Sequence, residues 1–149
     1  MDILRKQDLS IYYFLVDLFQ DAPFITIVDG FPVQNLVVPS ISVEAKMLNK
    51  QAFEMGNRRH LVPRVWIIDI FAKDKAQRDE FGYRIFTALD DPIPVYDYDE
   101  GFPPSVSPTQ LGSMEIMDTK MEIIKVLPEL VDNLYYRATV TFVASYSKV

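Results

Sequence analysis

The sequence predicts a single α+β domain with a mainly antiparallel or mixed β-sheet, two helices packed on it and a long C-terminal β-hairpin. Two segments carry apolar residues at helical spacing, and several others alternate between apolar and polar residues as strands do. The expected order is helix, strands, strand, helix, strand and hairpin, which is typical of an α+β fold. A length of 149 residues suits one domain with its own core, so we expect residues 1–149 to form a single domain.

The first twenty residues predict an amphipathic helix. Asp2 or Asp8 is suited to cap its start, and Pro23 follows closely enough to end it. Its apolar stripe has spacings of three and four and consists of Ile11, Phe14, Leu15, Leu18 and Phe19. We expect this stripe to face the core.

The next segment, up to residue 63, predicts short strands and turns. Residues 24–32 ("FITIVDGFP") indicate a strand that ends at an Asp–Gly turn. Residues 41–47 ("ISVEAKM") alternate as a half-buried strand does, and residues 51–55 ("QAFEM") are a candidate hairpin partner for them. Residues 56–63 ("GNRRHLVP") are expected to form a basic loop that contains His60.

The strand expected at Arg64–Ala72 is apolar on nearly both faces. One face carries Val65, Ile67, Asp69 and Phe71, and the other carries Trp66, Ile68, Ile70 and Ala72. A small chain has few elements that can cover two apolar faces of one strand. The main question that this sequence raises is therefore what covers the second apolar face of this strand.

A second helix is expected over residues 74–89, packed on a sheet that includes residues 64–72 and 134–146. Asp74 with Gln77 three residues later forms a capping-box pattern. The core stripe of this helix consists of Phe81, Ile85, Ala88 and Leu89. Gly82 costs a helix interior about 1 kcal/mol relative to alanine, so we expect a close packing contact there.

The C-terminal third predicts a loop and a long hairpin. Residues 100–113 are rich in proline and separate the hairpin from the preceding acidic segment. Residues 114–127 and 134–146 are its expected strands, and residues 128–133 ("PELVDN") are the expected turn.

Bulk composition narrows the class of protein. The 15 basic and 21 acidic residues give a formal net charge of −6, which argues against a dedicated nucleic-acid binder. The absence of cysteine from the sequence excludes disulfides and thiolate chemistry. The N-terminal segment lacks the features of a signal peptide, and no apolar run reaches membrane-spanning length. We therefore expect a soluble protein with no membrane partner.

Catalytic motifs are nearly absent from the sequence. His60 is its single histidine, so neither a multi-histidine metal site nor a histidine dyad can form, and we expect His60 to be a solvated loop residue. The patterns G-x-S-x-G, G-x-G-x-x-G and G-x-x-x-x-G-K-[ST] do not occur. We expect no catalytic residues, no cofactor and no metal.

Two charged clusters remain. Asp97, Asp99 and Glu100 have the wrong spacing for a calcium loop, although paired carboxylates also occur in glycosidases. We predict that these acids face solvent or a central channel without a bound metal. A basic cluster consists of Arg58, Arg59 and Arg64. These arginines could bind phosphates or the acidic side chains of a neighbouring subunit. For Arg58 and Arg59 we expect a solvated loop instead.

The segment 41–101 resembles the tail-terminator and tail-completion (head–tail joining) proteins of long-tailed bacteriophages. The likeness rests on "ISVEA", "FEMG", "VWIIDIFAKDKAQRDEFGYRIFTAL" and "IPVYDYDEG", spread over about sixty residues. The length, the element order and the final hairpin agree across most of the chain. The family has no short functional motif, so no binding site is carried over residue by residue.

The resemblance implies a virion structural protein that forms a hexameric ring of identical subunits, caps the tail tube and joins it to a neck or head-closure protein. DNA would pass through the ring without specific binding, and assembly would take place in the host cytoplasm. The strand face with Val65, Ile67, Asp69 and Phe71 would then lie on a second sheet layer or on the next subunit.

Two alternatives stay open. The chain could be another neck component, such as a head-closure or connector protein, or a minor tail protein. From a different class, it could be a small-ligand-binding or hydrolytic α+β domain that uses Tyr96, Asp97, Asp99 and His60. That class requires these groups to converge in one deep pocket.

Overall fold

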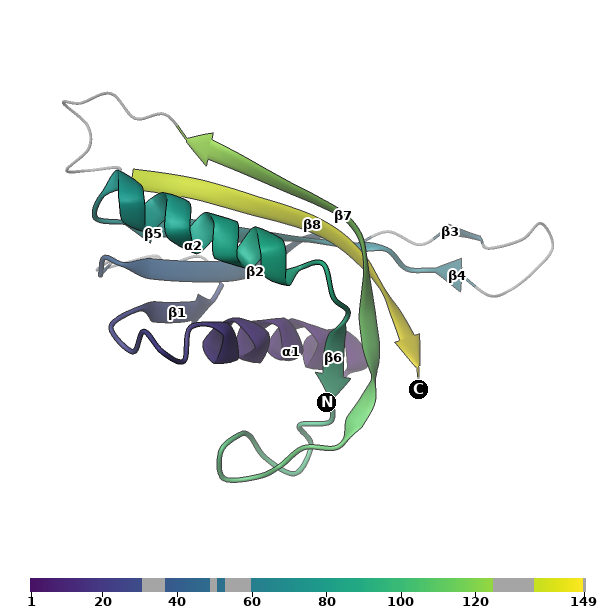
Figure 1. Ribbon diagram of the computed structural model, residues 1–149. Helices are drawn as coiled ribbons and strands as arrows, with labels where there is room; N and C mark the ends of the chain where they lie inside the picture. Colours follow the sequence, from purple (N-terminus) through teal and green to yellow (C-terminus); the bar gives the residue numbers. More distant parts are fainter. Residues whose placement is uncertain (31–36, 49–50, 53–59, 125–135, 149) are drawn as a thin grey trace.

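The computed structural model of the chain describes residues 1–30, 37–48, 51–52, 60–124 and 136–148, and only the backbone of residues 51–52 and 60–61 (Figure 1). The helices are α1 (Ile3–Leu18) and α2 (Lys75–Ala88). The strands are β1 (Thr26–Asp29), β2 (Ser40–Leu48), β3 (Gln51–Ala52), β4 (His60–Leu61), β5 (Arg64–Ala72), β6 (Ile93–Tyr96), β7 (Gln110–Ile124) and β8 (Tyr136–Lys148).

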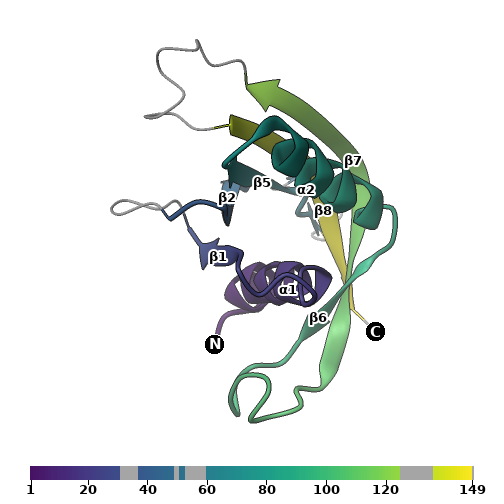
Figure 2. The ribbon, with the colours of Figure 1, turned by 60° about the vertical axis from the view of Figure 1, so that its left-hand side comes forward.

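Six strands form one curled sheet in the order β1-β2-β5-β8-β7-β6, and β3 pairs with β4 as a separate ribbon. The β1–β2 pair is parallel, whereas the other neighbours are antiparallel, so the sheet is mixed. Both helices lie on one face of this sheet, and α1 contacts strands from both of its edges, β1 and β6 (Figure 2). The predicted α+β class with a long C-terminal hairpin, β7–β8, is confirmed.

Helix α1 begins and packs as its sequence predicts. The Asp2 carboxylate accepts a hydrogen bond from the Leu4 backbone N–H at 2.8 Å, which satisfies one of the free donors of the first turn. Ile11 and Leu15 are fully buried, and Phe19 just beyond the helix is nearly so. The stripe therefore anchors α1 in the core.

Helix α2 confirms its predicted cap and its close packing contact. The Asp74 carboxylate accepts from the Gln77 N–H at 2.8 Å, and the Gln77 side chain accepts from the Lys73 N–H at 3.0 Å. A Cβ at Gly82 would collide with the Met121 methyl on β7. The glycine thus lets α2 lie directly against the sheet.

The core lies between the helices and one face of the sheet. On β5, Trp66, Ile68 and Ile70 point to the helices and are almost completely buried. The Trp66 ring stacks on Phe142 of β8 at 5.4 Å between centroids. Phe81 and Ile85 of α2 enter the same cluster, so the predicted packing of residues 74–89 on β5 and β8 is confirmed.

Two expectations about the segment before β5 are wrong. The antiparallel partner of β2 is β5 and not the hairpin strand expected at residues 51–55, because this pairing places Ile41 opposite Ile70 and Val43 opposite Ile68 on the buried face. Residues 51–52 pair instead with residues 60–61, so His60 belongs to a short strand and not to a loop. Arg58, Arg59 and the expected turn at 128–133 lie outside the described residues.

The C-terminal hairpin is shifted slightly from its expected bounds. Strand β7 begins at Gln110, within the segment expected to be loop, and β8 extends to Lys148. The earlier start lets β7 pair with β6 through residues 110–114.

Candidate subunit interface and neighbouring sites

The face of β5 opposite the helices carries the four residues of the predicted interface. Asp69 and Phe71 are 4% and 5% exposed within the single chain, whereas Val65 and Ile67 are half-buried. Arg137 of β8 forms an ion pair with Asp69 at 2.8 Å, and its guanidinium lies 5.0 Å from the centre of the Phe71 ring. One end of this face is thus already covered by the chain itself.

The other end of the same face forms a partly exposed apolar strip, defined here as Val65, Ile67, Thr141 and Val143. Val65 lies opposite Val143, and Ile67 lies opposite Thr141, so the four side chains adjoin on neighbouring strands. All four are half-buried. No described helix or strand packs over the strip, which leaves room for a neighbouring molecule.

Among the described strands, none pairs with the outer edge of β7 over residues 115–124, which is called its free edge below. Strand β6 pairs only with residues 110–114, so beyond them β7 is paired on the β8 side alone among the described strands. Met117, at a bulge in the β7–β8 register, is 61% exposed, and Ile123 is 40% exposed. An edge of this length with apolar side chains beside it is suited to pairing with another chain.

The predicted loop acids are partly neutralised by the start of α1. The Lys6 ammonium lies 2.9 Å from carboxylate oxygens of both Asp97 and Asp99, and the N-terminal amine of Met1 lies 2.9 Å from Asp99. These hydrogen bonds, that from Lys6 first, lower the pKa of Asp99 to about 2. Glu100 is exposed. Their orientation toward a channel stays a prediction.

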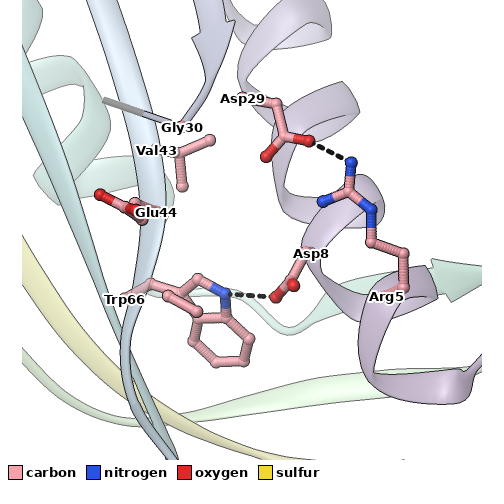
Figure 3. Close-up of a pocket in the computed structure, with 8 residues that line it drawn as sticks. Arg5, Asp8, Asp29, Gly30, Val43, Glu44 and Trp66 are labelled. Carbon is pink, nitrogen blue, oxygen red and sulfur yellow. Dashed lines mark hydrogen bonds and ion pairs between the residues drawn. The ribbon is translucent and has the colours of Figure 1, made fainter. Parts of the chain in front are cut away.

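A polar recess of about 320 Å³ lies beside α1, between that helix and strands β1, β2 and β5 (Figure 3). At one side Arg5 forms an ion pair with Asp29 at 2.6 Å. At its base the indole N–H of Trp66 donates to the Asp8 carboxylate at 3.0 Å. Of the charged residues that line the recess, Arg5, Asp8 and Asp29 therefore already have partners within the chain.

The Arg64 side chain is buried behind this recess, where it contacts Asp8. It is 5% exposed and lies 3.0 Å from Asp8, to which it is ion-paired. The idea that Arg64 meets phosphates or a neighbour's acids is therefore wrong, because its guanidinium is buried and ion-paired with Asp8 inside the fold. No local pattern in the sequence marks this contact, and the one available signal is Trp66, the single tryptophan, two residues further along β5.

The described part of the chain offers neither a cluster of metal ligands nor a membrane-spanning helix. Within it, no group of three or more histidine, aspartate or glutamate side chains is arranged to hold a metal ion. None of its helices combines the length and hydropathy needed to cross a bilayer. The side chain of His60 lies outside what the structure describes, so its convergence with Tyr96, Asp97 and Asp99 stays an untested alternative.

Comparisons with known proteins give a structural likeness but no match in sequence. No family model matches the chain, and no curated protein matches it. Among solved structures, the chain is similar to one from the "Virion of native gene transfer agent (GTA) particle", with a TM-score of 0.45 and 10% identity. The match covers 96% of this chain and 90% of that chain. A likeness at this level does not assign a function.

Proposed function

We propose that this protein is a virion structural subunit that forms a ring, hexameric by resemblance, at the end of a phage tail. The ring caps the tail tube and joins it to a neck or head-closure protein. Support comes from the resemblance of residues 41–101 to tail-terminator and tail-completion proteins. The mixed sheet, the two helices and the long β7–β8 hairpin are compatible with that resemblance.

The free edge of β7 at residues 115–124 is the observation that carries this proposal. Monomeric proteins usually pair or cover such an edge, because its unpaired N–H and C=O groups recruit other strands. We propose that another copy covers it, with the apolar strip as part of the contact. The β7 edge of one copy would meet a different surface on the next copy, so the contact is heterologous. Such contacts close into a ring when the rotation between successive copies permits it.

The same edge carries features that limit indiscriminate pairing. The bulge at Met117 and the charge of Lys120 are devices that natural edge strands use against aggregation. A free subunit would then stay monomeric until a tail tube brings copies together. A monomer in dilute solution is therefore compatible with the proposal.

The net charge of −6 fits the proposed passage of DNA through the ring. Like charge around a channel keeps the phosphate backbone from binding. Since Lys6 pairs with Asp97 and Asp99, Glu100 is the member of the predicted acid group with no ion pair among the described contacts. We therefore propose Glu100 as the acid with most influence on the channel potential.

Electron microscopy of the purified protein mixed with tail tubes tests the assignment. The wild type is expected to form rings at tube ends, and Met117→Lys is expected to abolish them, because the added charge would be buried at the edge. Met117→Leu, which keeps the apolar contact, and Tyr83→Lys, which adds the same charge on exposed α2 surface, should leave the rings intact.

The outcomes separate the alternatives. Rings that bind connectors but not tube ends would reassign the protein to another neck component. Wild-type protein that never forms rings, with or without tubes, would contradict the proposal.

A further inference from the structure

A second recess, of about 420 Å³, lies between α1 and the loop that follows β6. Tyrosine and proline side chains form most of its wall, and one carboxylate stands among them. The residues that matter here are Tyr13, Asp17, Tyr96, Tyr98, Pro103 and Pro104. Its volume is within the range of small-ligand sites.

The tyrosines of this recess are held in place by the fold. Tyr98 is 2% exposed, and its ring lies 5.5 Å from that of Tyr13 and 5.9 Å from that of Phe102. The Ser10 hydroxyl oxygen lies 3.5 Å from the Tyr98 hydroxyl and accepts a hydrogen bond from the Tyr96 N–H at 3.1 Å. The aromatic wall is therefore organised before any ligand arrives.

The recess also has negative character. Asp17 is exposed near the end of α1 and takes part in none of the ion pairs found among the described residues. Burial raises the pKa of Tyr98, and the neighbouring Tyr13, Tyr96 and Asp17 raise it further. Among the residues that the structure describes, no cationic side chain lines the recess.

We propose that this recess binds a cationic lysine or arginine side chain presented by a partner protein. The faces of tyrosine rings attract ammonium and guanidinium groups through the ring quadrupole, and Asp17 supplies the compensating charge. A proline-rich segment would also use tyrosine faces but would leave Asp17 without a role. The charge of the site therefore favours the cation, independently of the proposed ring.

An NMR titration with two matched probes tests this proposal. Nα-acetyl-lysine methylamide should shift the resonances of Tyr13, Tyr96 and Asp17 saturably, with a dissociation constant in the millimolar range. Nα-acetyl-norleucine methylamide has a similar side chain without the charge and should bind at least about fivefold more weakly.

Two variants inside the recess and one control outside it locate the interaction. Asp17→Asn changes an exposed residue, so the fold is retained, and it should weaken lysine binding about two- to fivefold. Asp91→Asn removes the same charge from an exposed position outside the recess and should change nothing. Loss of the Tyr96 ring in Tyr96→Leu should weaken binding about fivefold.

Three outcomes would overturn the proposal. The first is equal binding of the lysine and norleucine probes, which would indicate a plain apolar recess. The second is stronger binding of a tetraproline peptide than of the lysine probe. The third is the absence of any saturable shift with the lysine probe.

Discussion

Arg64 is the side chain whose loss should weaken the link between α1 and the sheet most strongly. Its guanidinium lies 3.0 Å from Asp8 and donates to the Leu4 carbonyl at 3.0 Å. It also donates to the Gln7 side chain at 3.1 Å and lies 4.6 Å from the centre of the Trp66 ring. One residue of β5 thus binds three positions on the helix.

Arg64→Met keeps most of the side-chain volume and removes all of these polar contacts. Removing one partner of a buried ion pair costs about 3–5 kcal/mol. Asp8 is 22% exposed and can recover some hydration, so we expect a loss near the lower limit, about 3 kcal/mol in the free energy of unfolding. For a domain of this size, that loss lowers Tm by roughly 10 °C.

Urea unfolding monitored by far-UV circular dichroism measures this loss, and the fluorescence of Trp66, the single tryptophan, reports on the site itself. Arg5→Met is the matched control. Arg5 is 50% exposed and pairs with Asp29, so its loss should cost less than about 1 kcal/mol. An Arg64→Met variant within about 0.5 kcal/mol of the wild type would refute this account of the contact.

Three further predictions concern single contacts. Because Lys6 lowers the pKa of Asp99 from 3.8 to about 2, Asp99 contributes stability that is present above about pH 4 and is lost as the pH falls toward 2. Urea midpoints of the wild type and Asp99→Asn should therefore differ at about pH 6 and converge at about pH 2, and a constant difference would contradict the linkage. Asp74→Ala should cost about 1 kcal/mol in urea unfolding, because the α2 cap is lost, and an unchanged midpoint would exclude that role. Gly82→Val should cost about 2 kcal/mol through overpacking against Met121, whereas Gly82→Ala should stay within about 1 kcal/mol because the Met121 methyl can move. Equal stability of the alanine and valine variants would refute the close contact.

The helices and the central strand could be predicted because their signals are local. The apolar stripe of α1, the cap formed by Asp74 and the apolar run of β5 each lie within one short segment. The contact required at Gly82 was predicted from its cost to the helix, although Met121 as the partner was not. Helical and strand periodicity report which face is buried, but they do not identify the neighbour.

Pairing and charge contacts could not be predicted, because they join distant segments. The parallel β1–β2 pair and the β2–β5 pair depend on which apolar faces fit together in the folded sheet. The burial of Ser42 follows from its place beside β5 and not from its own polarity. Lys6 meets Asp97 across more than ninety residues of sequence, and no local pattern marks that contact.

The subunit interface itself stays a prediction. The sequence indicates a strand over Arg64–Ala72 with a surplus apolar face, and Val65 and Ile67 are partly exposed on the helix-free side. The sequence could not show that Arg137 covers the other end of this face, or that residues 115–124 of β7 form a free edge. Both features depend on the strand order of the complete sheet.

Deletion of the gene, followed by electron microscopy of the lysate, tests the proposed role in a phage tail most directly. Without a subunit that caps the tail and joins it to the neck, filled heads should accumulate apart from tails that are headless or abnormally long. Supplying the wild-type protein should restore joined particles, whereas Met117→Lys, which places a charge at the β7 edge, should not. Normal virions assembled in the absence of the protein would contradict the account.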